Sequence, residues 1–167
     1  TRYISVTGVQ TCALPISAKR YLWNYYNRVP RQMLYKTATA SWTYNSTTWR
    51  QHNAAAAYKL NFVIGVSEDL IVAQDVIASR GNDSAYPSSS IGLDSTSAVS
   101  SDVLYSNSIA ASATTGNESI STYAGYPGIG VHYLAGIEKS SAGSASCNFQ
   151  GVSANDYQYG MYGSVNA

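Results

Sequence analysis

Residues 58–66, YKLNFVIGV, constrain the fold of this chain more than any other stretch. Apolar side chains occupy every second position of this run: Tyr58, Leu60, Phe62, Ile64 and Val66. A period of two is that of a β-strand with one buried face. The sequence therefore predicts a sheet that buries one side, preceded by residues 52–57, whose alanines are too few for a stable helix.

Residues 41–51, SWTYNSTTWRQ, predict an aromatic β-hairpin. Trp42 and Tyr44 alternate with hydroxyl side chains, and Asn45-Ser46 is good turn material. A two-residue loop places Trp42 opposite Trp49, and a four-residue loop places Tyr44 there instead. In either register Trp42, Tyr44 and Trp49 share a face, so they are expected to form part of the core.

Other apolar runs predict further strands. Residues 20–26 and 31–39 are candidates, and residues 70–79 (LIVAQDVIAS) favour a strand over a helix because several of them are β-branched. Later candidates are residues 90–94, 102–105, 130–138, 143–149 and 161–165. In the strand over 130–138 the expected buried set is Val131, Tyr133, Ala135 and Ile137.

Short strands separated by polar connections indicate an all-β protein. Their spacing predicts an antiparallel β-sandwich or jelly roll. Neither half of the chain has enough apolar strands to bury a sheet alone, so we expect a single domain over residues 18–167.

Residues 1–17 resemble a segment of foreign origin. Residues 6–16, VTGVQTCALPI, match the in-frame translation of a common sequencing-library adapter through eleven successive codons. Segments of this kind are set aside before fold reasoning. We therefore expect residues 1–17 to be a non-native leader and the domain to be truncated at its N-terminus.

Composition narrows the class of protein. Charged residues make up only 11% of the chain, whereas tyrosine occurs 15 times. A surface of tyrosine, serine, asparagine and threonine is typical of extracellular β-proteins. No apolar run approaches 18 residues, so no membrane insertion is expected. Basic residues are scattered without forming a run, so no nucleic-acid partner is expected either.

Residues suited to catalysis or metal binding are few. His52 and His132 are the only histidines, and no G-x-S-x-G motif is present. His132 falls opposite the expected apolar set of its strand, which indicates a solvated or interface position; Asp94 or Glu138 are the acids that a Ser–His–acid site there would use. Cys147 is the one thiol outside the leader, and no metal-ligand spacing exists. No catalytic residue, metal or cofactor is predicted.

The surplus of tyrosine is the one functional signal in the residues themselves. Tyr86, Tyr105, Tyr123 and Tyr126 lie in the polar, loop-rich half of the chain, where binding residues concentrate. Aromatic rings stack on sugars, so these four are the candidate ligand-binding residues. Tyrosine is equally enriched at contacts between subunits, and that alternative stays open.

Four motifs carry a resemblance to a known family. They are W-x-Y-x4-WR in residues 42–50, FVIGVSED in 62–69, IGLDST in 91–96 and G-x-HYL-x-x-IE in 130–138. With the residues around them, most of 25–151 resembles the C-terminal domain of virion structural proteins of tailed phages, often found in environmental assemblies.

The resemblance implies a β-sandwich head, trimeric, displayed on a tail fibre or capsid surface. Such a head would contact host-surface glycans or stabilise the particle, and no catalytic residue is carried over. The rival hypothesis is a carbohydrate-binding module or a fragment of a carbohydrate-active enzyme.

Overall fold

The computed structural model describes residues 26, 28–81, 85–105, 117–143, 146–152 and 157–166. These residues form two antiparallel β-sheets and one short 3-10 helix, η2 (His52–Ala54). The predicted antiparallel all-β sandwich is confirmed, whereas jelly-roll topology stays a prediction. The expected leader over 1–17 and residues 20–25 of the first expected strand lie outside the described residues.

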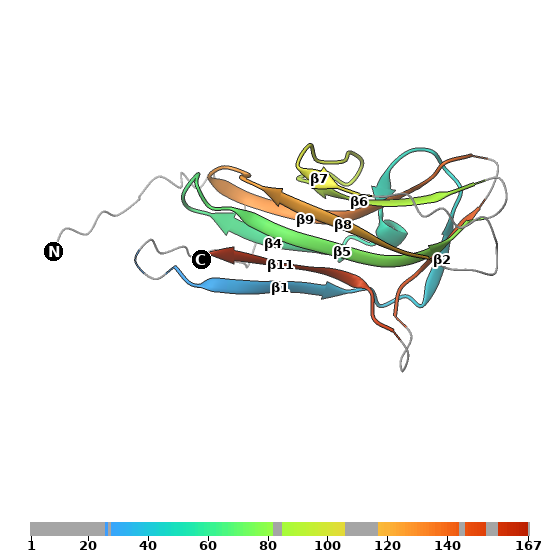
Figure 1. Cartoon of the computed structure of the whole chain (residues 1–167), viewed down its shortest axis with the longest axis horizontal. Helices are drawn as coiled ribbons and strands as arrows, with labels where there is room; N and C mark the ends of the chain where they lie inside the picture. The colour runs from blue at the N-terminus through green and yellow to red at the C-terminus, as the bar shows by residue number, and fades with distance from the viewer. Residues whose placement is uncertain are drawn as a thin grey trace, which may run out of the picture.

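The larger sheet is organised around its longest strand, β5. One edge of β5 pairs with β8, which pairs with β7. The other edge pairs first with β11 and then with β10, and these carry β1 and β2 respectively. In Figure 1, β1 and β11 lie along one side of the view and β7 along the other. The strands are β1 (Pro30–Lys36), β2 (Ser41–Tyr44), β5 (Ile71–Arg80), β7 (Val103–Leu104), β8 (Asn117–Gly125), β10 (Cys147–Gln150) and β11 (Gly160–Asn166).

The smaller sheet is built in the same way around β9. One edge of β9 pairs with β4 and then with β3, and the other edge pairs with β6. The strands are β3 (Arg50–Gln51), β4 (Lys59–Ile64), β6 (Pro87–Leu93) and β9 (Gly130–Ser140). Both sheets thus combine strands from the early and late parts of the chain.

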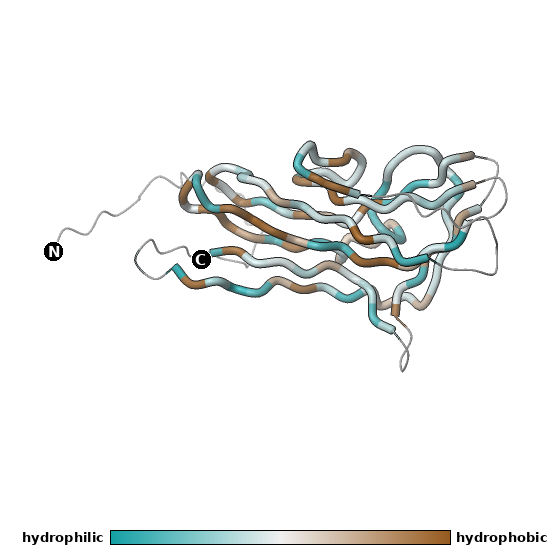
Figure 2. Tube along the Cα trace, in the orientation of Figure 1, coloured by the Kyte–Doolittle hydropathy of each residue, from teal (hydrophilic) through white to brown (hydrophobic). Residues whose placement is uncertain are grey.

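Two apolar clusters fill the space between the sheets. The larger cluster has as its largest fully buried members Ile64, Ile71, Ile91, Tyr123, Leu134 and Met161. The smaller cluster contains Trp42, Ile77, Ala85, Cys147 and Phe149. On the inner face of β5, the buried Asp75 lies between Ala73 of the larger cluster and Ile77 of the smaller one. Figure 2 shows the corresponding hydrophilic stretch in the middle of β5.

The predicted aromatic hairpin is wrong, because residues 41–51 cross from one sheet to the other. β2 pairs with β10 in the larger sheet, and β3 pairs with β9 in the smaller one. Local bonds hold the crossing: the Tyr44 hydroxyl donates to the Thr48 carbonyl at 3.0 Å, and the Thr48 amide donates to Ser46 Oγ at 3.2 Å. Alternation shows that one face of each strand is buried, but it does not identify the partner strand.

The two strands with the clearest sequence patterns are confirmed. In β4 the buried residues are Leu60, Phe62 and Ile64, as the alternation predicts. Residues 71–80 form β5 rather than a helix. Residues 52–54 form only the single turn η2, consistent with a run too short for a stable helix.

The predicted apolar set of β9 is confirmed as buried for Ala135 and Ile137 and is wrong for the exposed Val131. Val131 is 63% exposed, and the inner face continues through Leu134, Gly136 and Glu138, opposite the inward residues of β4 and β6. Ala135 and Ile137 are buried as well, on the outer side of the strand.

One long strand was missed. β8 buries Ser119, Ser121, Tyr123 and Gly125 on its inner face, so its buried positions are mostly small or polar and give no apolar alternation.

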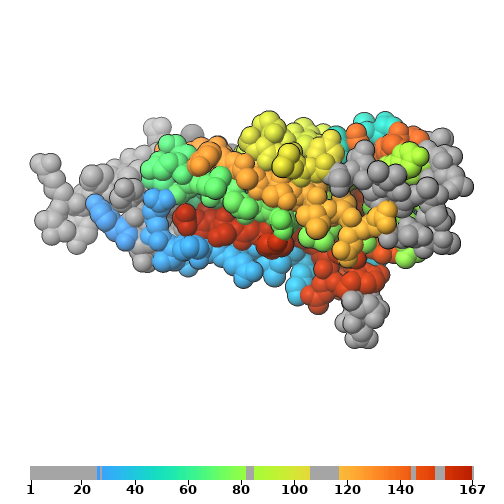
Figure 3. All heavy atoms as spheres, viewed as in Figure 1, coloured from blue at the N-terminus to red at the C-terminus, as the bar shows by residue number. Residues whose placement is uncertain are grey.

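The connection before β7 covers one side of the smaller sheet. A Cβ at Gly92 would lie 2.7 Å from the Ala98 carbonyl, and the Ser100 amide donates to the Ile91 carbonyl at 3.0 Å. In Figure 3 this segment (yellow) stands out as a raised ridge. Along this edge of β6 no further strand pairs with β6 in the described residues, and the connection supplies a backbone hydrogen bond there instead.

Gly136 provides the first test of this packing. A Cβ there would collide with the Tyr35 hydroxyl and lie 2.7 Å from His52 Nδ1. Gly136→Ala is therefore expected to lower the free energy of unfolding by about 1–3 kcal/mol, measured by urea denaturation. Gly143→Ala is the matched control, since its Cβ would meet only the Asn45 carbonyl at 3.8 Å. Equal stability of the two variants would contradict the packing described.

Candidate functional site

The carboxylate of Glu138 joins the two sheets. It is fully buried on β9, and it accepts hydrogen bonds from Trp42 Nε1 at 2.7 Å and Arg50 Nε at 2.9 Å. The backbone N–H of Asn53 donates to the same carboxylate at 3.2 Å. We call Trp42, Arg50, Asn53 and Glu138 the Glu138 cluster. Because Trp42 lies in the larger sheet and Arg50 in the smaller one, the cluster fixes the spacing of the layers.

Two opposing effects act on the charge of Glu138: burial disfavours the carboxylate, and its neighbours favour it. Burial raises the pKa of Glu138 above its ordinary value, whereas His52, Trp42 and Arg50 act in the opposite direction. Arg50 also forms an ion pair with Glu138, with Nη2 2.8 Å from Oε1. Such a carboxylate serves the fold, because a buried charge requires its partners to stay in place.

A second buried group lies nearby, and we call Tyr35, His52, Asp75 and Ser89 the Asp75 cluster. Ser89 Oγ donates to Asp75 Oδ2 at 3.1 Å, and the Tyr35 hydroxyl donates to Asp75 Oδ1 at 3.2 Å. His52 Nε2 lies 3.1 Å from Ser89 Oγ and 3.1 Å from the Ile137 carbonyl. Burial raises the pKa of Asp75 to about 7 and lowers the pKa of His52.

The Asp75 cluster contains serine, histidine and aspartate but lacks the geometry of a catalytic triad. In a triad the acid bonds one ring nitrogen of histidine and the serine the other. Here Ser89 lies against Nε2, Asp75 Oδ2 is 3.6 Å from the same nitrogen, and Nδ1 has no hydrogen-bond partner. All three side chains are buried, so a substrate would have no access. The cluster is a structural element of the core.

His132 is largely shielded from solvent, so of its two predicted placements the solvated one is wrong and the interface one stays a prediction. Its side chain is only 13% exposed and lies beside Phe62, with ring centroids 5.9 Å apart. His132 Nδ1 is 2.7 Å from Asp94 Oδ2, and Asp94 Oδ1 accepts from the Tyr133 amide at 2.9 Å. Of the two acids considered for His132, Asp94 is therefore the neighbour, and Glu138 belongs to the core. The pair ties the end of β6 to β9.

Three of the four candidate tyrosines are exposed. Tyr86, Tyr105 and Tyr126 are 41%, 42% and 62% exposed. Tyr123 requires a correction: its ring is fully buried in the larger apolar cluster, and burial raises its pKa to about 12. An inward position on β8 explains this, so Tyr123 has no surface on which a ligand can stack.

The expected core aromatics have separate roles. Trp42 is buried and stacks on Phe149, with ring centroids 6.2 Å apart. Tyr44 is half-buried under the Arg50 guanidinium, 3.7 Å from its ring centroid. Trp49 meets Tyr105 edge-on at 5.8 Å, so it packs on the outside and not in the core. The three therefore do not share one face.

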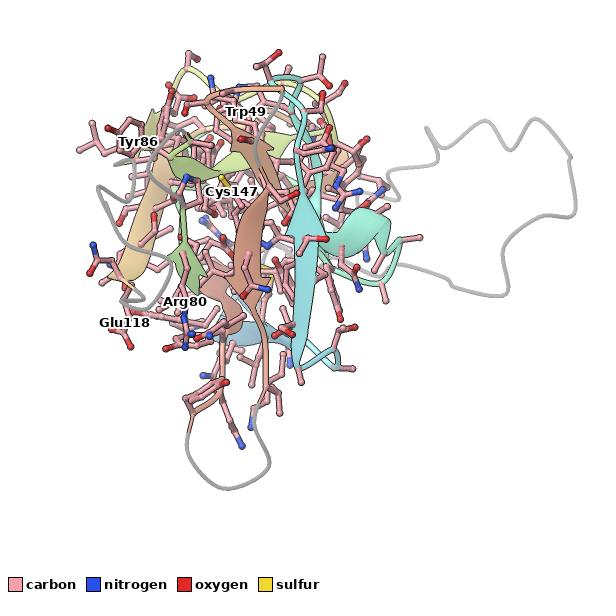
Figure 4. The ribbon with its side chains drawn as sticks, turned by 90° about the vertical axis from the view of Figure 1, so that its right-hand side faces the viewer. Trp49, Arg80, Tyr86, Glu118 and Cys147 are labelled. Atoms are coloured by element: carbon pink, nitrogen blue, oxygen red, sulfur yellow. The ribbon has the colours of Figure 1, made fainter. Side chains whose placement is uncertain are left out.

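A shallow groove of about 500 Å³ lies on the outer face of the larger sheet, where β5, β10 and β2 adjoin. Polar side chains line it, and none of them was singled out from the sequence. They are Ser41, Arg80, Ser146, Asn148, Gln150 and Tyr157. Figure 4 shows Arg80 in the lower part of the end that faces the viewer, and Trp49 and Tyr86 in the upper part. Finding this groove from sequence would have required the register of three strands that are distant in the chain.

Other kinds of site receive no support within the described residues. No group of three or more histidine, cysteine, aspartate or glutamate side chains is placed to hold a metal ion there. Cys147 is buried, and its thiol donates to Ser140 Oγ at 3.3 Å. Among the described residues, no helix has the length and apolar character needed to span a bilayer. Comparison with known protein families, curated proteins and solved structures finds no match to this chain.

From the Glu138 cluster we predict that loss of the Arg50 guanidinium lowers the free energy of unfolding by an amount that depends on pH. Arg50→Met leaves Glu138 buried without its ion pair and is expected to lower the free energy of unfolding by about 2 kcal/mol at pH 8. The loss should shrink at pH 5, because the raised pKa lets Glu138 take up a proton. Urea denaturation at both pH values measures it.

Lys36→Met is the control for Arg50→Met, since the Lys36 amine contacts only exposed Gln158 among the described residues. It should change stability by less than about 0.5 kcal/mol. An Arg50→Met loss that is the same at both pH values would argue against an ionised Glu138.

Asp75 predicts the opposite of ordinary acid denaturation. Its pKa of about 7 in the fold lies above the ordinary value of 3.8, so folding takes up a proton between these values. The stabilisation is complete below about pH 4 and is lost as the pH rises to 7, by about 4 kcal/mol in total.

Asp75→Asn should remove this loss. The difference in unfolding free energy between Asp75→Asn and the parent is measured from pH 4 to 8 and should grow in favour of the variant. Glu68→Gln, at an exposed carboxylate, should leave the pH profile unchanged. Parallel profiles for Asp75→Asn and the parent would refute the raised pKa.

Proposed function

We propose that this chain is the head domain of a tailed-phage virion protein, carried on a tail fibre or on the capsid surface. In this function it assembles as a homotrimer, attaches to glycans of the host surface and catalyses no reaction. Its location is then the virion surface, outside the cell, and neither nucleic acid nor a membrane interior is its partner.

The positions of the four motifs support this proposal. The first motif supplies Trp42 and Arg50 to the Glu138 cluster, and the last supplies Glu138 itself. The second motif forms the end of β4 and the turn after it, and the third begins on β6. These motifs build the framework of the sandwich, as expected of a family defined by its fold.

The observation that carries the proposed attachment is the exposure of Tyr86, Tyr105 and Tyr126. Each lies outside the long strands and keeps part of its surface exposed, although Tyr105 also packs against Trp49. Tyrosine offers a sugar both a stacking face and a hydroxyl at its rim. Weak contacts of this kind become sufficient when three copies bind a repeating polysaccharide.

A carbohydrate-binding module, or a fragment of a carbohydrate-active enzyme, is the second candidate. The polar groove at Arg80 favours it, because one module with one groove binds sugar without assembling.

The test combines solution mass with binding. Light scattering after size exclusion should give three times the chain mass of 17.9 kDa. Host-surface polysaccharide should bind, and alanine at Tyr86, Tyr105 or Tyr126 should weaken binding about tenfold while the mass stays unchanged. Tyr162→Ala is the matched control, because Tyr162 is 46% exposed but lies on β11.

The outcomes separate the hypotheses. Loss of the trimer in the tyrosine variants would place these rings in subunit contacts instead. A monomer that binds polysaccharide would favour the carbohydrate-binding module. A monomer that binds no polysaccharide would refute the proposed head domain.

A further inference from the structure

The groove on the outer face of the larger sheet has a floor fixed by strand register. Asn148 on β10 is paired with Arg80 on β5 and with Thr43 on β2. One step along, Gln150 is paired with Ala78 and Ser41. Side chains at alternate positions point to the same face, so Arg80, Asn148 and Gln150 project together from neighbouring strands.

An aromatic ring borders this floor. Tyr157 lines the groove and packs against Tyr159, with ring centroids 5.2 Å apart. Tyr159 is buried, and its hydroxyl donates to Glu118 Oε1 at 3.1 Å. Figure 4 shows Glu118 and Arg80 on the same side of the molecule. The position of Tyr157 is thus supported by β8 through Tyr159.

Arg80 brings a positive charge that the described residues do not neutralise. With the Gln150 side-chain amide turned so that its oxygen faces the guanidinium, Arg80 Nε and Nη2 donate to that oxygen at 3.1 and 2.8 Å. That partner is neutral, and no carboxylate of the described residues lies within ion-pair distance of Arg80. A guanidinium has five N–H donors in a planar fork, so Gln150 orients the group and leaves donors for a ligand.

Together these features fit a saccharide that carries a carboxylate. A volume of about 500 Å³ is within the usual range for small-ligand sites. Tyr157 offers a ring at the border, Ser41 and Asn148 offer hydroxyl and amide groups for sugar hydroxyls, and Arg80 offers a fork that matches a carboxylate. A neutral sugar would leave the guanidinium without a counter-charge from the described residues.

We propose that this groove binds acidic saccharides, with the sugar carboxylate on Arg80 and a sugar ring against Tyr157. The inference goes beyond the proposed attachment through Tyr86, Tyr105 and Tyr126, because it places a separate saccharide site on the larger sheet. The two surfaces belong to different sheets, since Arg80 ends β5 of the larger sheet and Tyr86 directly precedes β6 of the smaller one.

The experiment is a calorimetric titration of the full chain with tetragalacturonate and with its methyl ester, which keeps the sugar skeleton but removes the charge. The acid should bind at least about tenfold more tightly than the ester. Arg80→Gln should weaken binding of the acid about tenfold and abolish its advantage over the ester. The affinity of Arg80→Lys for the acid should lie between those of the parent and Arg80→Gln, because lysine keeps the charge but lacks the planar set of N–H donors.

Two further variants complete the test. Tyr157→Ala should weaken binding of acid and ester alike, since stacking does not depend on the carboxylate. Arg31→Gln, at an exposed arginine of β1, makes the same change in net charge and should leave binding unchanged. Thermal melting confirms that each variant is folded.

The inference is overturned if the ester binds as tightly as the acid, if Arg80→Gln keeps full affinity, or if Arg31→Gln loses as much affinity as Arg80→Gln. Its failure is distinct from failure of the proposed function. If the chain is a trimer that binds host polysaccharide but not uronate, only the proposed acidic-saccharide site is refuted. If it is a monomer that binds uronate through Arg80, the site is supported and the proposed virion head domain is refuted.

Discussion

The buried charge of Glu138 is the constraint on which the rest of the sandwich depends. A carboxylate taken out of water is tolerated only when donors and a counter-charge accompany it. Here the donors come from both layers, Trp42 from the larger sheet and Arg50 from the smaller. The crossing of residues 44–50 between the sheets follows from this requirement, because it delivers the indole and the guanidinium to opposite sides of one carboxylate. Apolar packing alone would permit the layers to slide, whereas these directed bonds do not.

The turn η2 connects the Glu138 cluster to the Asp75 cluster. The backbone N–H of Asn53 donates to Glu138. The ring of the preceding residue, His52, forms a hydrogen bond with Ser89, which in turn donates to Asp75. Asn53 and Ala54 both have φ of 51°, a conformation that non-glycine residues rarely adopt. Two consecutive residues, His52 and Asn53, thus contact two buried groups, and the apolar core is divided where those groups lie. The interior therefore excludes water and also fixes how the two sheets align with each other.

The sequence predicted the fold class and the strands whose alternation is regular, such as β4, because apolar side chains on one face must be buried. It did not predict which strands become neighbours. Trp42 and Trp49 show why: both alternate with polar residues, yet one packs in the core and the other on the outside. Glu138 and Asp75 were assigned to no cluster, because a charged residue within an apolar run is ordinarily assumed to face water. The groove depended on cross-strand register, which a single sequence does not contain. The exposed Tyr86 and Tyr126, by contrast, lie in polar connections that the sequence identifies directly.

The bonds to Glu138 also bear on how the chain reaches its fold. Trp42 and Arg50 are separated from Glu138 by 96 and 88 positions along the chain. Contacts of such separation form slowly, because a long loop must close before they are made. During synthesis the early strands therefore wait for β9, with the apolar face of β4 uncovered in the meantime. Refolding of the purified domain is accordingly expected to be slow for its size, and the nascent chain to be vulnerable to aggregation until its last third has left the ribosome.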